Sequence, residues 1–230
     1  MKMRLANALI VASLLLSGCI TAPQTPVSLS QDALSAKSGR VGVAMTTLPK
    51  ADTHIVGASC LLCYASAAAA NSALTTYAQT LPFEDLPQLK NAMADLLRNK
   101  GADAVVITDS IDLKTLQSSD KEGPNVAKLN FAPFGQKYNI DKLLMIDIAA
   151  LGFYRTYSSY FPTSDPKAYL QGVGYIVNLK TNAYEWYMPV NITKSTDKSW
   201  DEPPQFPGLS NAYFQVVEIG KDTFMQPFKN

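Results

Sequence analysis

Histidine is almost absent from this chain of 230 residues, and cysteine is scarce. His54 is the only histidine, so a Ser-His-Asp or Cys-His catalytic site would have to use it. No Gly-x-Ser-x-Gly motif is present to supply the serine of an α/β-hydrolase. Cys60, Cys63 and one imidazole also fall short of the four ligands that a structural zinc ion takes. We therefore expect no metal, no cofactor and no catalytic residue.

An excess of charge of either sign is also lacking. The chain has 20 basic and 19 acidic residues, a formal net charge of +1, and no run of basic residues. Nucleic-acid-binding domains gather Lys and Arg on one face, which this sequence does not predict. Gly172-x-Gly174 lacks the third glycine of a dinucleotide-binding loop and the helix that should follow. These absences argue against nucleic acid as a partner.

No apolar run is long enough to cross a bilayer. The longest, Leu5 to Leu16, spans about 18 Å as a helix, against a hydrocarbon core of about 30 Å. Lys2 and Arg4 precede it, and the small residues Ser17 and Gly18 follow it. This is the layout of a secretory signal, so we predict that residues 1–18 are a leader that is removed.

The leader ends in Leu16-Ser17-Gly18-Cys19, which resembles the lipobox of bacterial lipoproteins. The resemblance implies that Cys19 becomes the mature N-terminus and carries acyl chains, including palmitate. Three chains would hold the protein on a membrane firmly, whereas one chain binds only marginally. Ile20 stands where lipoproteins kept in the inner membrane often carry Asp, which implies the outer membrane, with the protein facing the periplasm. The alternative is an ordinary secretory signal that happens to precede a cysteine.

The mature chain divides into two parts. Residues 19–38 contain Pro23 and Pro26 and show no sustained apolar period, which predicts an acylated N-terminus and a flexible tether. A docked N-terminal extension is the alternative. Residues 39–230 show one composition throughout and are long enough for one well-buried globular domain.

The pattern of apolar residues predicts a single-domain α/β sandwich with a mixed sheet, in the order β-α-α-β-α-β-β-β-α. Asp85 and Gln88 have the spacing of a capping box, which predicts that a helix begins after Asp85. Gly101 is expected to end that helix. The last strands should be antiparallel, with a hairpin turn at Thr181-Asn182. The expected elements are a strand at 40–48, a buried helix at 61–78, a helix at 86–100, a strand buried on both faces at 104–107, a short helix at 134–138, strands at 142–153, 169–179 and 183–192, and a helix at 209–224.

Two sequence segments resemble those of a group of periplasmic domains. Lys137 to Ile146 looks like the entry of a helix into a central strand, and Gly174 to Thr181, shortly before Trp186, looks like the following hairpin. The group contains the TolB N-terminal domain, lipoprotein activators of penicillin-binding proteins and curli-secretion-type lipoproteins. The resemblance covers about residues 40–225 and implies binding to an envelope protein. The Cys60–Cys63 segment instead resembles small uncharacterised bacterial lipoproteins with an Ala-rich helix.

Cys60-Leu61-Leu62-Cys63 has redox spacing at the expected start of a helix, where the unpaired N–H groups lower a thiol pKa. Its neighbours are apolar, and no Lys or Arg lies nearby to stabilise a thiolate. A structural disulfide between Cys60 and Cys63 fits an oxidising periplasm. A redox-active pair is the alternative.

Aromatic residues are the best candidates for binding a partner. Tyrosine and tryptophan offer a large contact area at low entropic cost and keep a polar tip. Cross-strand pairs that stabilise the sheet are the alternative explanation. The predicted partner-binding residues are Tyr154, Tyr157, Tyr160, Phe161 and Trp186.

The sequence thus favours a non-enzymatic adaptor, held on the membrane by its acyl chains, that binds an envelope protein. A subunit of a secretion or surface-assembly complex, bound to copies of itself, is one alternative. A thiol-disulfide oxidoreductase that uses Cys60 and Cys63 is the other.

Overall fold

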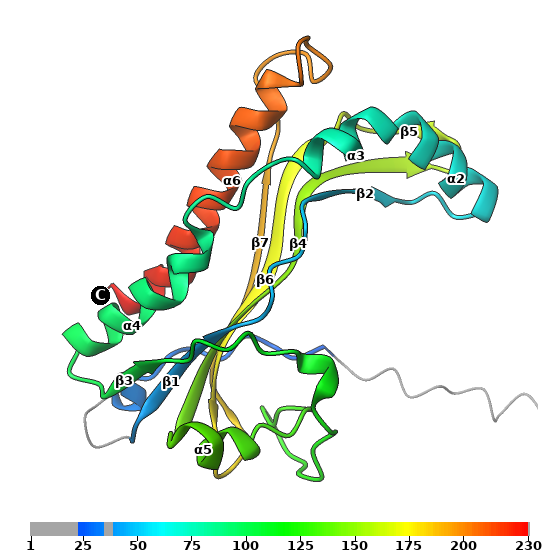
Figure 1. Ribbon diagram of the computed structural model, residues 1–230. Helices are drawn as coiled ribbons and strands as arrows, with labels where there is room; N and C mark the ends of the chain where they lie inside the picture. Colours follow the sequence, from blue (N-terminus) through cyan, green and yellow to red (C-terminus); the bar gives the residue numbers. More distant parts are fainter. Residues whose placement is uncertain (1–22, 35–38, 230) are drawn as a thin grey trace, which may run out of the picture.

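The protein, seen in a computed structural model, is built on a mixed sheet in the order β3-β1-β4-β6-β7 (Figure 1). The structure describes residues 23–34 and 39–229, so the predicted leader and Cys19 lie outside the described residues. Strand β1 runs parallel to β3 and β4, whereas β4, β6 and β7 are antiparallel. Two further strands, β2 and β5, pair only with β4. The strands are β1 (Val41–Met45), β2 (Asp52–Val56), β3 (Ala104–Val106), β4 (Lys142–Ser158), β5 (Phe161–Pro162), β6 (Lys167–Asn178) and β7 (Tyr184–Lys194).

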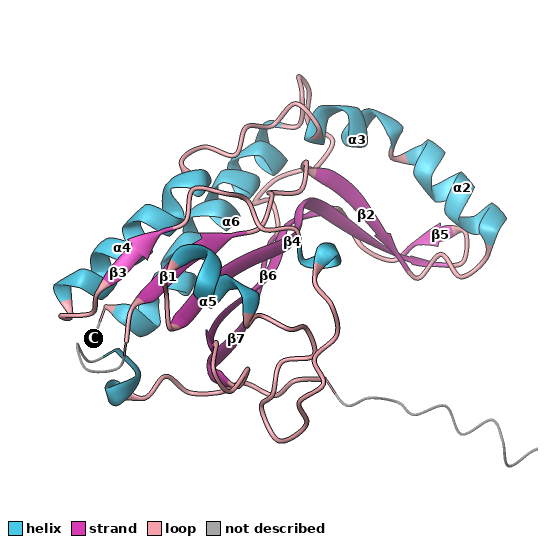
Figure 2. Cartoon of the chain, turned by 60° about the horizontal axis from the view of Figure 1, so that its bottom comes forward, coloured by secondary structure: helices cyan, strands magenta, loops and turns pink. Residues whose placement is uncertain are grey.

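Helices cover both faces of this sheet (Figures 1 and 2). Helices α4 and α6 pack on one face, and α5 covers the other together with the chain between β3 and α5. Two more helices, α2 and α3, follow β2. The helices are α2 (Leu61–Ala70), α3 (Ser72–Ala78), α4 (Leu89–Asn99), α5 (Pro133–Tyr138) and α6 (Pro207–Met225), with short 3-10 turns η2 (Gln31–Leu34), η4 (Leu86–Gln88), η5 (Leu113–Thr115) and η6 (Gln226–Phe228).

Each face has its own hydrophobic core. On the α4 and α6 side, Met93, Leu97 and Tyr213 are fully buried against the sheet. On the α5 side, Phe131 and Tyr175 belong to a smaller cluster. Burying one large apolar side chain contributes about 1.5–3 kcal/mol, so the larger cluster supplies more of the hydrophobic stabilisation than the smaller one. The predicted single-domain α/β fold with a mixed sheet is confirmed.

One end of the sheet extends well beyond the helices α4, α5 and α6 (Figure 1). We call this part the arm: it comprises residues 52–80, with β2, α2 and α3, and residues 152–169, with the outer half of β4 and β5. We call the rest of the described chain the body. The arm begins beside a β-bulge between Ile148 and Ala150. At its root, Gly152 has φ +126, and a Cβ there would lie 2.1 Å from the carbonyl oxygen of Asp52. A side-chain-free residue therefore allows β2 to join β4 at this point.

The arm differs from the prediction in two ways. Residues 52–56 form strand β2, where the sequence predicted no element, so His54 lies in a strand. The expected buried helix at 61–78 is two helices that meet at Asn71, and most of the side chains of α2 are exposed. The Asn71 side chain is buried and donates to the carbonyl oxygen of Ala67 and to the Tyr157 hydroxyl. These bonds hold Asn71 toward the sheet and break the helix there.

Two details of the body also differ. The side chain of Asp85 caps no helix, because it pairs with Lys221 of α6. Strand β3 lies at the edge of the sheet, and Val105 and Val106 are only half-buried. The prediction of a strand buried on both faces at 104–107 is therefore wrong.

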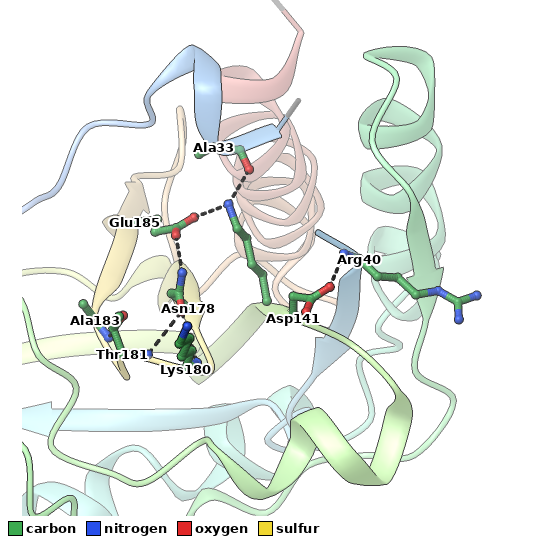
Figure 3. Close-up of polar contacts among 9 residues, drawn as sticks. Ala33, Arg40, Asp141, Asn178, Lys180, Thr181, Ala183 and Glu185 are labelled. Atoms are coloured by element: carbon green, nitrogen blue, oxygen red, sulfur yellow. Dashed lines mark hydrogen bonds and ion pairs between the residues drawn. The ribbon is translucent and has the colours of Figure 1, made fainter. Parts of the chain in front are cut away.

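The N-terminal segment 23–34 lies against the body. Val27 exchanges backbone hydrogen bonds with Tyr187 of β7, at 2.9 and 3.0 Å. The buried ammonium of Lys142 donates to the carbonyl oxygen of Ala33 at 2.9 Å and pairs with Glu185 at 2.6 Å (Figure 3). The flexible tether expected over 19–38 is thus wrong for residues 23–34, because a buried cation needs the oxygen atoms that this segment supplies. The alternative of a docked extension holds there.

Candidate binding surfaces

A groove of about 880 Å³ opens on the α5 side of the sheet. We call it the tyrosine groove, because Tyr175, Tyr184 and Tyr187 line it from strands β6 and β7. Residues 23–25 of the docked N-terminal segment also line it, as do residues 123–126. Its volume falls in the usual range for ligand-binding clefts, about 300–1,000 Å³.

The three tyrosines pack against one another. The rings of Tyr184 and Tyr187 lie 4.9 Å apart between centroids, and those of Tyr175 and Tyr187 lie 6.2 Å apart and stacked. Burial raises the pKa of Tyr184 to about 12, and raises the pKa of Tyr175 well above its ordinary value. All three hydroxyls therefore keep their protons at neutral pH and can donate hydrogen bonds.

Asp147 of β4 lies in the same groove and is half-buried. One of its carboxylate oxygens accepts a hydrogen bond from the Thr46 hydroxyl at 2.9 Å. Burial raises the pKa of this carboxyl, and the Thr46 bond only partly opposes that effect. Within the described residues Asp147 has no basic partner in an ion pair. A partly desolvated carboxylate of this kind can bind a hydrogen-bond donor or a cation from outside the chain.

The second candidate surface is the end of the arm. Its six large apolar side chains are exposed, and Leu61, Phe161 and Leu62 reach 84, 74 and 70% exposure. Cys60 Sγ lies 3.7 Å from the Tyr160 hydroxyl, which brings the start of α2 beside the turn that leads to β5. We call this surface the arm tip. It comprises Val56, Leu61, Leu62, Tyr64, Tyr160 and Phe161.

Charged side chains are missing from the sequence around the arm tip. No Lys, Arg, Asp or Glu occurs from residue 53 to 83, or from residue 156 to 164. Arg155, between these stretches, is half-buried and donates to the carbonyl oxygen of Ser164 at 3.0 Å and to the Asn71 side chain at 3.3 Å. Apolar patches without charge mark sites of protein or membrane contact.

Cys60 and Cys63 form a disulfide at the start of α2. Cys60 is the residue that precedes the first turn of the helix, and its sulfur accepts from the backbone N–H of Cys63. The bond closes the turn that displays Leu61 and Leu62. Because this neighbourhood contains no charged side chain, none is available to stabilise a thiolate.

The five aromatic residues predicted to bind a partner do not form one surface. Tyr160 and Phe161 lie at the arm tip. Tyr154 is half-buried, and its ring lies 5.5 Å from the ring of Tyr169, centroid to centroid. Tyr157 and Trp186 are only 7 and 3% exposed, because Tyr157 binds Asn71 and Trp186 packs on Phe228. The prediction that Tyr157 and Trp186 contact a partner is therefore wrong.

The tyrosine groove was missed as a site. Asp147 interrupts an apolar strand, and Tyr175, Tyr184 and Tyr187 belong to the hairpin that follows, so their residue types were visible in the sequence. Their meeting depends on the pairing of Met145 with Tyr175 and of Tyr175 with Tyr187 across three strands. A carboxylate within an apolar strand, together with a tyrosine-rich hairpin after it, was the available signal.

Over residues 23–34 and 39–229, no three His, Cys, Asp or Glu side chains gather as ligands for a metal ion. In the same residues, no helix combines the length and apolarity needed to span a bilayer.

Comparison with known proteins places the chain near several solved structures, each at low similarity. No protein-family model matches the chain, and no curated protein matches its sequence. The PelC dodecamer of Paraburkholderia phytofirmans aligns over 89% of this chain and 95% of its own, with 11% identity and a TM-score of 0.38. A hypothetical protein of Chlamydia trachomatis aligns over 82 and 94%, with 10% identity and a TM-score of 0.34. The lipoprotein GNA1162 of Neisseria meningitidis aligns over 78 and 95%, with 11% identity and a TM-score of 0.28. Likenesses this weak carry no argument about function.

Proposed function

We propose that this chain is an acylated lipoprotein of the outer membrane, facing the periplasm, that acts as a non-enzymatic adaptor for an envelope protein. Cys19 carries the acyl chains, as the resemblance of residues 16–19 to a lipobox implies. The tyrosine groove binds a segment of the partner. The observation that carries this proposal is a half-buried carboxylate, without a basic partner among the described residues, in a groove that three tyrosines also line.

The chemistry of the groove indicates the kind of segment that it binds. Protonated tyrosines offer flat apolar faces and hydroxyl donors, which suit a polypeptide backbone and its side chains. Asp147 favours a segment with a Lys, an Arg or another donor, because a charged hydrogen bond stabilises a partly buried carboxylate more than a neutral one. The docked residues 23–25 form part of the wall, so the groove lies next to the segment that leads to the anchor.

Photo-crosslinking in intact cells tests this proposal. A photoreactive aromatic residue in place of Tyr187 should give an adduct with one envelope protein, and Asp147→Asn should lower its yield about 10-fold. The same residue in place of Ile219, which is exposed on α6, is the matched control and should not give that adduct.

The outcome also separates the alternatives. An adduct made with equal yield in the Asp147→Asn variant, or equally from position 219, contradicts the groove as the binding site. An adduct of the chain with itself contradicts the adaptor and favours a subunit of an assembly. Cells that carry the chain with both Cys60 and Cys63 replaced by Ser can be compared with cells that carry the wild-type chain. If both behave alike, the result contradicts a thiol-disulfide oxidoreductase.

A further inference from the structure

We propose that the arm tip binds the surface of the lipid bilayer in which the chain is anchored. This inference rests on the proposed acylation of Cys19. It adds a second membrane contact that holds the domain in one orientation. The occupant is a lipid surface of the same membrane, rather than a second copy of the chain or a protein partner.

The first observation is the composition of the arm tip. Leu61, Leu62 and Phe161 are more exposed than any other large apolar residues of the described chain. Tyr64 and Tyr160 lie beside them, at 51 and 49% exposure. Apolar side chains flanked by tyrosines match the lipid interface, where the aromatic body lies among acyl chains and the hydroxyl stays in water.

The second observation is the absence of charge around the arm tip. A charged group near the acyl chains is costly, whereas protein interfaces keep a polar and charged rim. Residues 53–83 and 156–164 contain no Lys, Arg, Asp or Glu, although such residues make up 17% of the whole chain. The arm tip therefore bears no side-chain charge that would have to be desolvated when it enters the interface. The charged residues of the arm, Asp52, Arg155, Asp165 and Lys167, lie outside these two stretches.

The third observation is the short distance between the domain and its anchor. Because Val27 is paired with Tyr187, only eight residues lead from Cys19 to a fixed point, and they reach at most about 28 Å. At about 3.3 Å per residue, strand β4 runs at most about 43 Å from Met145, level with Tyr187 across the sheet, to Ser158 at the arm tip. An arm inclined to the bilayer thus brings its tip to the surface while the anchor stays in it. Both views show the described chain beginning on the side toward which the arm extends (Figures 1 and 2).

The exposed turn of α2 is also held in shape. The Cys60–Cys63 disulfide spans Leu61 and Leu62, and the N-cap bond from the Cys63 N–H to Cys60 Sγ closes the same turn. A turn fixed before binding loses less conformational entropy when its side chains enter the lipid. The disulfide thereby serves the contact without any redox step.

Fluorescence quenching in vesicles tests the inference. The acylated full chain with Phe161→Trp is reconstituted in vesicles of phosphatidylethanolamine and phosphatidylglycerol that carry doxyl-labelled lipid. The emission of the introduced tryptophan, after subtraction of the signal of Trp186 and Trp200, should shift to the blue and be quenched by the labelled lipid. A tryptophan introduced on the body by Ile219→Trp should show neither effect. Adding Leu61→Ser and Leu62→Ser to Phe161→Trp should lower the insertion equilibrium constant about 100-fold, because two leucines no longer enter the lipid. Both leucines are exposed, so the fold does not depend on them.

Three results would overturn the inference. A chain that pellets with the vesicles but shows no quenching from position 161 contradicts the tip contact and leaves the acyl anchor intact. A chain that stays in solution contradicts the proposed acylation and the inference together. A blue shift that depends on protein concentration and needs no vesicles would indicate a second copy on the arm tip.

Discussion

The arm and the body both consist of strands covered by helices, but they differ in charge and in the exposure of their apolar side chains. In the described chain the ion pairs lie in the body, and its large apolar side chains are buried or half-buried apart from Ile219. The arm has uncharged helices and exposes the six residues of its tip. The body is therefore built to be stable in water, whereas the arm is completed by something outside the chain. This difference suggests that binding to a partner and binding to a surface are assigned to separate regions.

The largest expected effect falls on the body. Glu185→Ala leaves the Lys142 ammonium buried without its carboxylate, which should cost about 3–5 kcal/mol of unfolding free energy. Glu218→Ala is the matched control: this exposed acid also pairs with a buried lysine, Lys221, but Asp85 remains to pair with that lysine, so the cost should be under about 1 kcal/mol. Urea unfolding measures both. Equal losses would show that the buried pair does not fix the N-terminal segment.

A smaller effect is expected at the root of the arm. Gly152→Val should cost about 3 kcal/mol, because the new side chain meets the backbone of Asp52 and separates β2 from β4. Gly101→Ala is the control: it also has a positive φ, but a Cβ there meets nothing within 4 Å. It should cost about 1 kcal/mol from backbone strain alone. Hydrogen exchange should show the loss in β2, α2 and α3, and an equal loss throughout the body would contradict a separate arm.

The smallest effect concerns Asp147 and changes with pH. Burial raises the pKa of Asp147 above 3.8, so the folded state binds that proton more tightly than the unfolded state does. Its contribution to stability is therefore most favourable at low pH and falls as pH rises through the folded pKa. Asp147→Asn should be more stable than the parent chain at neutral pH, and the difference should vanish below 3.8.

Asp109→Asn is the control of opposite sign. Hydrogen bonds from Tyr138 and Lys137 lower the pKa of Asp109, so its carboxylate stabilises the fold above 3.8. This variant should lose stability at neutral pH and approach the parent chain as pH falls. Urea unfolding across this pH range measures both variants. If the unfolding free energy of Asp147→Asn changes with pH in the same way as that of the parent chain, the claim that burial raises the pKa of Asp147 is contradicted.

Most of the body could be predicted from sequence, because its elements have a clear period. The leucines of α4 reflect burial of one helix face against the sheet, and the apolar run of β4 reflects burial of a central strand on both faces. Strand β2 was missed because Asp52, Thr53 and His54 are polar and its partner strand lies about 100 residues later. The break at Asn71 depends on a hydrogen bond to Tyr157, which no local pattern shows.

The candidate sites were predictable to different degrees. Tyr160 and Phe161 were identified as candidate contact residues because they are aromatic and lie in a segment that the sequence predicts to be an exposed turn. The tyrosine groove was missed because its walls come from the N-terminal segment, β4, β6 and β7, which only the folded chain brings together. Tyr157 and Trp186 share the residue types of contact sites, and only their burial separates them from Tyr160 and Phe161.

One measurement tests the central claim, that the arm and the body bind different things. A photoreactive aromatic residue is placed at position 161 in one strain and at position 187 in another, and both strains are grown with labelled palmitate. The account predicts lipid adducts but no protein partner from position 161, and an envelope-protein adduct from position 187. The same protein caught from both positions, or no lipid adduct from position 161, would contradict it.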